Sequence, residues 1–277
     1  MNFSKLIINV ALTGIVPTKE KNPCLPITPK EIAADAKRVY DLGASIVHIH
    51  ARDENGSPSH KKEIYKEMIE RIREKCDALL ITASTSGRRS RDIIERMEVL
   101  ELEGACKPDM ASITLGSLNF MEDYALNDPQ AILSLLNTMN SSNIRPEIEI
   151  FDTGMANFAK YLFKKGHLKG TLYSNLILGS LGTMPATPKN LNHLIDELPE
   201  SLIWGATGVG RFAFRIQSLS IAMGGHVRVG LEDSVYMDEE KREPATNEKL
   251  VLRALKVAEA VGRDMATPRE VRALLGL

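Results

Sequence analysis

Residues 45–53 read SIVHIHARD, and this stretch decides the fold. Apolar residues alternate there with His48, His50 and Arg52. In an extended strand successive side chains point to opposite faces, so one face of this segment is polar and the other is apolar. The apolar face has to pack against a second layer of structure, which identifies the segment as one strand of a layered fold.

Seven further segments resemble this strand, and longer helical patterns separate them along the chain. The alternation of strand and helix requires parallel strands joined by helical crossovers. Eight such units in 277 residues predict a single (β/α)₈ barrel, the TIM-barrel fold of about 250 residues, over residues 1–277. The other predicted strands are residues 6–14, 78–86, 110–117, 145–152, 171–179, 201–208 and 226–233.

Helix boundaries agree with this arrangement. Thr28-Pro29-Lys30-Glu31 is a capping box with proline at the first helical position, and Gly43 ends the helix that follows. Asp128-Pro129 and Thr187-Pro188 begin two more helices, and Thr267 begins a short C-terminal helical extension. The rival architecture is an open doubly wound sheet, which usually carries a glycine-rich turn after its first strand. The single glycine in LTGIVPT favours the barrel.

Composition limits the classes of partner. The net charge of −1 provides no field that would draw the protein to nucleic acid or to an anionic membrane. Three cysteines without Cys-x-x-Cys spacing argue against a disulfide framework and fit a reducing cytoplasm. The apolar run over residues 5–12 is too short for a signal peptide or a membrane span. We therefore expect a cytoplasmic protein that acts on small molecules.

Polar residues gather towards the C-terminal ends of the predicted strands. Because the apolar face of each strand has to meet the helices, the polar face points into the barrel. Carboxylates and imidazoles in a barrel interior are costly unless they bind something. Active sites of this fold lie at the C-terminal end of the barrel, so we expect the functional site there.

His48 and His50 lie on one face of the second strand, and Glu232 lies at the C-terminal end of the eighth. These two strands flank the first strand in a closed barrel, so the three side chains can converge on one ion. Two imidazoles and a carboxylate with an open position form a common catalytic zinc site. Iron, manganese or cobalt would suit the same ligands. The alternative is a hydrogen-bonded polar cluster without a metal.

Several longer motifs resemble one known family. LPITPKEI, GASIVHIHARDENGSPS, KPDMASITLGSLNF, RPEIEIFDTGM and GGHVRVGLED are similar to the β-keto acid cleavage enzymes, whose type activity is 3-keto-5-aminohexanoate cleavage. The resemblance covers nearly the whole chain. It implies a zinc-dependent homotetrameric barrel that converts a β-keto acid and acetyl-CoA to acetoacetate and a new acyl-CoA.

The resemblance also implies roles for individual residues. It assigns zinc binding to His48, His50 and Glu232, an Arg–Asp catalytic dyad to Arg228 and Asp233, and substrate contacts to Ser84, Ser112 and Glu149.

The residues leave other roles open for these positions. Strand alternation places Arg228 and Asp233 on opposite faces, so their pairing requires the chain to turn after Glu232. Arg228 would otherwise neutralise Glu147 or Glu149. The two serines would otherwise be small polar fillers.

The loop after the first strand departs from the family pattern. Relatives that act on amino-substituted keto acids would need an acidic residue there to meet the ammonium group, and this chain has Val16. Arg88 and Arg89 follow the third strand, and arginine suits a second carboxylate. The sequence therefore predicts a neutral or dicarboxylic β-keto acid, with Arg88 as a substrate contact. The alternative is that both arginines are solvated surface residues.

Two other functions compete with this interpretation. One is a different metal-dependent carbon–carbon lyase or aldolase that works without CoA. The other is a non-catalytic binder of small molecules. Dependence on acetyl-CoA separates the first from the predicted activity, and turnover separates the second.

Overall fold

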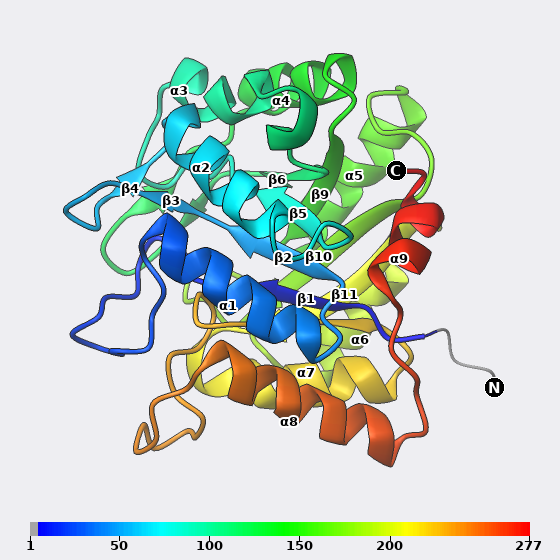
Figure 1. The fold of residues 1–277 in the computed structure, drawn as a ribbon. Coiled ribbons are helices and arrows are strands. Elements are labelled where there is room, and N and C mark those ends of the chain that lie inside the picture. Colours follow the sequence, from blue (N-terminus) through cyan, green and yellow to red (C-terminus); the bar gives the residue numbers. More distant parts are fainter. Residues whose placement is uncertain (1–4) are drawn as a thin grey trace.

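A closed barrel of parallel strands forms the centre of the computed structural model, which describes residues 5–277 (Figure 1). Within these residues eight strands close in the order β1-β12-β11-β10-β9-β6-β5-β2. The predicted (β/α)₈ barrel is confirmed, and the open sheet is excluded. The barrel strands are β1 (Ile8–Ala11), β2 (Ile46–Ile49), β5 (Leu80–Ala83), β6 (Met110–Thr114), β9 (Arg145–Ile150), β10 (Leu172–Leu178), β11 (Leu202–Gly208) and β12 (His226–Val229).

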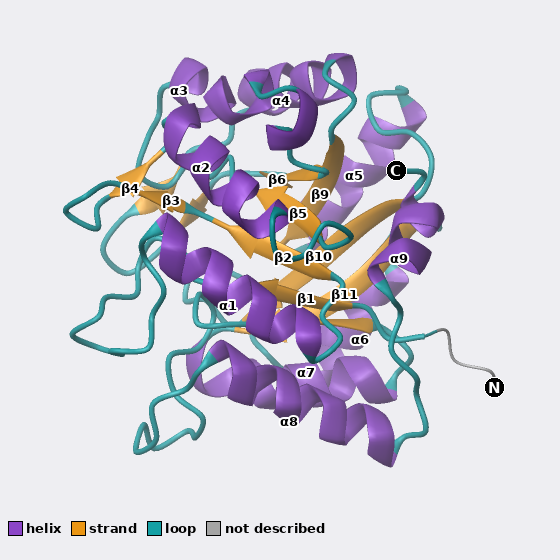
Figure 2. Ribbon diagram, viewed as in Figure 1, coloured by secondary structure: helices purple, strands orange, loops and turns teal. Residues whose placement is uncertain are grey.

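Helices surround the strands on the outside of the barrel (Figure 2). Thr28 caps the first helix in a capping box, and Asp128, Thr187 and Thr267 cap three others, as predicted. The α-helices in the described part of the chain are α1 (Pro29–Asp41), α2 (Lys62–Arg73), α3 (Ile93–Met97), α4 (Pro129–Ser141), α5 (Thr153–Lys164), α6 (Pro188–Asp196), α7 (Ala213–Ala222), α8 (Asn247–Ala260) and α9 (Pro268–Leu275). Short 3₁₀ helices span Glu98–Glu101, Gly104–Cys106 and Gly210–Phe212.

Except for β11, which ends at Gly208 as predicted, the barrel strands are shorter than the sequence predicts at their C-terminal ends. The second one stops at Ile49, and Ala51–Arg52 (β3) pairs instead with Pro58–Ser59 (β4) in a hairpin outside the barrel. Asp53 closes this hairpin, because its carboxylate accepts the backbone N–H groups of Asn55 and Ser57. A second hairpin joins β7 (Leu118–Asn119) to β8 (Tyr124–Ala125). Both hairpins extend from the C-terminal end of the barrel, where the site is expected.

Register places the two strands that carry the predicted metal ligands on either side of β1. Ala11 lies opposite His48 of β2, and Asn9 lies opposite Arg228 of β12. The side chains of β2 and β12 can therefore meet above β1, as the sequence predicts.

The opposite end of the barrel is a closed apolar layer. Ile7, Ile46, Leu80 and Met110 pack there against Val271 and other residues of the C-terminal helix α9. Figure 1 shows α9 at the end of the barrel that lies away from the β3–β4 hairpin. Apolar side chains fill this end of the barrel, so the polar residues of the site lie at the other end.

No helix of residues 5–277 is long and apolar enough to cross a membrane. Cys24, Cys76 and Cys106 are all free.

A buried histidine at the closed end predicts how stability depends on pH. The Nδ1 atom of His226 accepts the backbone N–H of Ile7 at 3.0 Å, so this ring is neutral. Burial, together with the nearby Arg263, lowers the pKa of His226 to about 3. Between the unfolded pKa of about 6.5 and pH 3 only the unfolded chain binds this proton, so stability is lost as the pH falls.

The His226→Asn variant should remove this dependence, because the amide oxygen accepts the same bond and does not titrate. We expect urea unfolding between pH 6.5 and 5 to give a free energy whose mean slope is flatter by about 1 kcal/mol per pH unit than in the wild type. Equal slopes in the two proteins would contradict this assignment.

Candidate metal centre and active-site cavity

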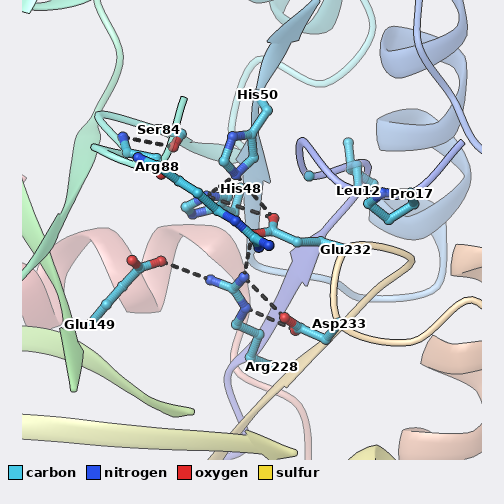
Figure 3. Close-up of polar contacts among 12 residues, drawn as sticks. Leu12, Pro17, His48, His50, Ser84, Arg88, Glu149, Arg228, Glu232 and Asp233 are labelled. Carbon is cyan, nitrogen blue, oxygen red and sulfur yellow. Dashed lines mark hydrogen bonds and ion pairs between the residues drawn. The ribbon is translucent and has the colours of Figure 1, made fainter. Parts of the chain in front are cut away.

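Three of the predicted ligands converge at the C-terminal end of the barrel (Figure 3). The Nε2 atoms of His48 and His50 are 3.1 Å apart. The Oε2 atom of Glu232 lies 3.2 Å from the Nε2 of His50 and 3.8 Å from that of His48. Ligand atoms around a tetrahedral zinc with bonds of about 2.0–2.1 Å are roughly 3.3 Å apart. The three donors therefore have the spacing that one small divalent ion requires.

Glu147 fixes the orientation of His48. Its Oε1 atom lies 2.9 Å from the Nδ1 of His48, and its Oε2 accepts hydrogen bonds from Asn9 and Thr82. A carboxylate bound to Nδ1 directs the Nε2 lone pair away from itself and towards the other two donors. The sequence placed Glu147 on the inward face of its strand and indicated it only as a possible partner of Arg228, not of His48. The signal was its position two residues before Glu149 on the same face.

The charge of the site also fits a cation. Four carboxylates, those of Glu147, Glu149, Glu232 and Asp233, lie around the single guanidinium of Arg228 and the two imidazoles. The carboxylates of Glu232 and Glu147 outweigh burial and raise the pKa of His48, whereas burial lowers the pKa of His50. The Oε2 of Glu232 makes no hydrogen bond of good geometry within residues 5–277. An excess of negative charge and a carboxylate oxygen directed at two imidazoles are what a divalent ion would satisfy.

Arg228 and Asp233 pair, as the resemblance implies. The Nε of Arg228 lies 2.9 Å from one carboxylate oxygen of Asp233, and its Nη2 lies 3.2 Å from the other. Arg228 also contacts Glu232 at 2.9 Å and Glu149 at 3.2 Å (Figure 3). The alternative role of Arg228, neutralising a barrel carboxylate, is thus also present at Glu149. Burial raises the pKa of Asp233, and the guanidinium only partly offsets this effect.

A turn at Gly230 makes this pairing possible. The last barrel strand ends at Val229, so Glu232 and Asp233 lie beyond it. The prediction that Glu232 lies on the strand is therefore wrong. Gly230 has φ of +145°, and the N–H of Asp233 bonds back to its carbonyl. A Cβ at this position would lie 2.0 Å from the carbonyl oxygen of Ala11. Only glycine allows the turn that brings both carboxylates to Arg228.

These groups line one cavity of about 370 Å³ at the mouth of the barrel. His50, Ser84, Arg88 and Glu149 line it together with Arg228, Glu232 and Asp233. Ser112 is buried, with its carbonyl bonded to Thr85, and is not among the residues that line the cavity. The predicted contact between Ser112 and substrate therefore stays a prediction without support from the cavity.

Arg88 has a partner that the sequence did not indicate. Its Nε donates to the Oδ1 of Asp123 at 2.8 Å, and its guanidinium lies 3.7 Å from the centre of the Phe120 ring. Asp123 is 35 residues away in the sequence and belongs to the turn of the β7–β8 hairpin. Arg88 is therefore neither a solvated surface residue nor an unpaired cation.

The chain as a whole also resembles known proteins. The model of the beta-keto acid cleavage enzyme family matches residues 5–277. The chain belongs to this family.

Two curated relatives have different substrates in their names. A 3-keto-5-aminohexanoate cleavage enzyme of Fusobacterium nucleatum subsp. nucleatum is 39% identical to the chain over 276 residues, which are 99% of each protein. A 3-oxoadipate:acetyl-CoA acetyltransferase of Cupriavidus necator is 34% identical over 98% of this chain and 94% of its own length. Family membership therefore leaves the substrate of this chain undetermined.

A solved structure supports the fold. The apo structure of ObcA matches with a TM-score of 0.80 and 18% identity, over 92% of this chain and 66% of that chain. At this identity the match shows the shared barrel alone.

The Gly230 turn gives a test of how the site is built. In Gly230→Ala the methyl group would meet the carbonyl of Ala11, so we expect the free energy of unfolding to fall by about 2–4 kcal/mol. The matched control is Gly262→Ala, because Gly262 has φ of +71° and no atom within 4 Å of an added Cβ. The control should lose only about 1 kcal/mol. If urea unfolding gave the same loss of unfolding free energy in both variants, the close contact between Gly230 and Ala11 would not be what requires glycine.

Proposed function

We propose that this chain is a zinc-dependent β-keto acid cleavage enzyme that uses acetyl-CoA as its co-substrate. The observation that carries the proposal is the convergence of His48, His50 and Glu232 beside the Arg228–Asp233 pair in one cavity. Family membership and a relative named as an acetyl-CoA acetyltransferase support it.

The proposed reaction exchanges one carbon–carbon bond for another. The carbon between the keto and carboxylate groups of the substrate loses a proton and attacks the thioester carbonyl of acetyl-CoA, which releases the CoA thiolate. The thiolate then attacks the keto carbon, and the bond from that carbon to the nucleophilic carbon breaks. The products are acetoacetate and a new acyl-CoA. The proton that is removed first returns at the end, so no oxidant or reductant is needed.

The residues of the chain supply separate parts of this chemistry. A divalent ion held by His48, His50 and Glu232 would stabilise the negative charge that develops on the keto acid. Asp233 is held by Arg228 and lines the cavity, so we assign it as the base that accepts the proton. Ser84 lines the same cavity and would donate a hydrogen bond to the keto acid.

Glu149 has a positioning role in this proposal. One of its oxygens lies 3.2 Å from Arg228, and the other accepts from Thr114 at 2.7 Å. It therefore holds the guanidinium from the side opposite to Asp233 and stays close enough to the cavity to contact substrate, as the sequence predicts. The homotetramer implied by the resemblance and the cytoplasmic location also stay predictions.

Removal of one ligand tests the proposal. We expect about one zinc per chain in the wild type by elemental analysis, and none in His50→Ala. CoA-dependent turnover of β-keto acids should fall at least about 1,000-fold in this variant, because the metal contributes several kcal/mol.

His193→Ala is the matched control, since this histidine is exposed on α6. Its metal content and turnover should equal those of the wild type. A wild type without bound metal, or a His50→Ala protein with normal metal content and turnover, would contradict the proposal.

A further inference from the structure

The loop after β1 lies directly against a proposed metal ligand. Gly14 has φ of +62°, and a Cβ at this position would lie 2.6 Å from the Cγ of Glu232. The backbone of the loop therefore packs on the Glu232 side chain. Ile15 and Val16 follow immediately, and both line the cavity. Whatever part of a substrate extends past Glu232 on this side meets two apolar side chains.

A buried arginine fixes this loop in place. The Nε and Nη2 of Arg52 donate to the carbonyl of Gly14 at 3.1 and 2.8 Å, and Nη2 also donates to the carbonyl of Pro17 at 2.8 Å. The Nη1 atom donates to the carbonyl of Gly56 at 3.0 Å. Arg52 is only 5% exposed, so water does not compete for these bonds. Ile15 and Val16 are consequently held by a clamped loop and are not free to move away from a charged substrate.

A second part of the cavity wall is also apolar. Leu118, Phe120, Met121 and Ala125 of the β7–β8 hairpin line it. Arg88 lies in this wall, where its Nε donates to Asp123 and the Phe120 ring covers its face. The other oxygen of Asp123 lies 3.5 Å from the Nε of Arg89. A second substrate carboxylate would have to compete with Asp123 for the charge of Arg88.

The acidic residues that line the cavity are also paired with a cation. Glu149, Glu232 and Asp233 line it, and each contacts the guanidinium of Arg228. An ammonium group on the substrate would therefore find no lining carboxylate outside the Arg228 cluster, where the second oxygen of Glu232 faces His48 and His50. A charged group placed against such walls is disfavoured unless it is paired.

We infer that the enzyme takes a β-keto acid whose substituent is uncharged and apolar. Ile15 and Val16, clamped by Arg52, and the β7–β8 hairpin are the elements that select it. This inference rests on the proposed function and narrows the expectation of a neutral or dicarboxylic substrate to the neutral class. In this account Arg88 shapes the wall and does not bind a second carboxylate.

Three six-carbon acids test the inference, because they differ mainly in the charge of the substituent. They are 3-oxohexanoate, 3-oxoadipate and 3-keto-5-aminohexanoate. With acetyl-CoA, kcat/KM for 3-oxohexanoate should exceed that for each charged acid by roughly 100-fold or more. A wild-type preference for either charged acid, or equal values for all three, would overturn the inference.

Two variants with matched controls locate the selectivity. Val16→Glu should raise kcat/KM for 3-keto-5-aminohexanoate relative to 3-oxohexanoate at least about 10-fold. Val16→Gln, which has the same shape as the glutamate variant but no charge, should not change this ratio. Asp123→Asn frees Arg88 and should shift the ratio towards 3-oxoadipate by a similar factor. Glu122→Gln, an exposed neighbour in the same turn, should leave the ratio unchanged. Unchanged ratios in both Val16→Glu and Asp123→Asn would assign selectivity to other residues and overturn this part.

Binding without acetyl-CoA separates this inference from the proposed function. Calorimetric titration of each acid into the wild-type protein ranks the substituents even if no acid is turned over. Tighter binding of 3-oxohexanoate together with no CoA-dependent turnover would reject the proposed reaction and keep the apolar selectivity. Turnover together with equal or tighter binding of a charged acid would support the proposed reaction and reject the apolar selectivity.

Discussion

The Arg228 guanidinium is buried inside the barrel and contacts three carboxylates, and the rest of the site depends on this arrangement. Only 1% of its side chain is exposed. Leaving such a group without partners would cost several kcal/mol. Glu149, Glu232 and Asp233 outweigh the effect of burial and raise the pKa of Arg228. The guanidinium thus stays charged and holds two carboxylates of one turn and one of a distant strand in fixed positions.

This arrangement has consequences for the neighbouring histidines. Arg228 binds one oxygen of Glu232, which leaves the other oxygen facing His48 and His50. The negative charge of the site exceeds what one guanidinium neutralises, because Glu147 adds a further buried carboxylate next to His48. One ion-pair cluster therefore supplies both the negative charge that a divalent cation would satisfy and the fixed position of Asp233, the proposed base. The Gly230 turn is the local feature of the backbone on which that cluster depends.

Much of the fold and part of the site could be predicted from the sequence. Alternation in SIVHIHARD places His48 and His50 on the inward face, and eight strand–helix units predict a closed barrel; both features depend on local pattern alone. The predicted extent of β12 was wrong, because the turn at Gly230 ends the strand at Val229, four residues before the predicted end at Asp233. The Arg228–Asp233 pair depends on that turn, so alternation could not predict it.

The site contacts that the sequence could not predict join residues that are far apart in the chain. Asp123 lies 35 residues from Arg88, and Glu147 lies 99 residues from His48. Arg52 reaches back 38 residues to the carbonyl of Gly14. Each of these residues is polar and unremarkable in its own segment, and its role follows from what the closed barrel brings beside it. Arg88 shows the consequence, because a cation that appeared available in the sequence is paired in the fold.

The most direct test of the central claim is the fate of the acetyl carbons. Acetyl-CoA carrying ¹³C at both acetyl carbons should be incubated with an unlabelled β-keto acid, and both products should be analysed by mass spectrometry. If the substrate carbon attacks the thioester, acetoacetate carries both labelled carbons and the new acyl-CoA carries none. Unlabelled acetoacetate, or label in the new acyl-CoA, would contradict this account of the reaction.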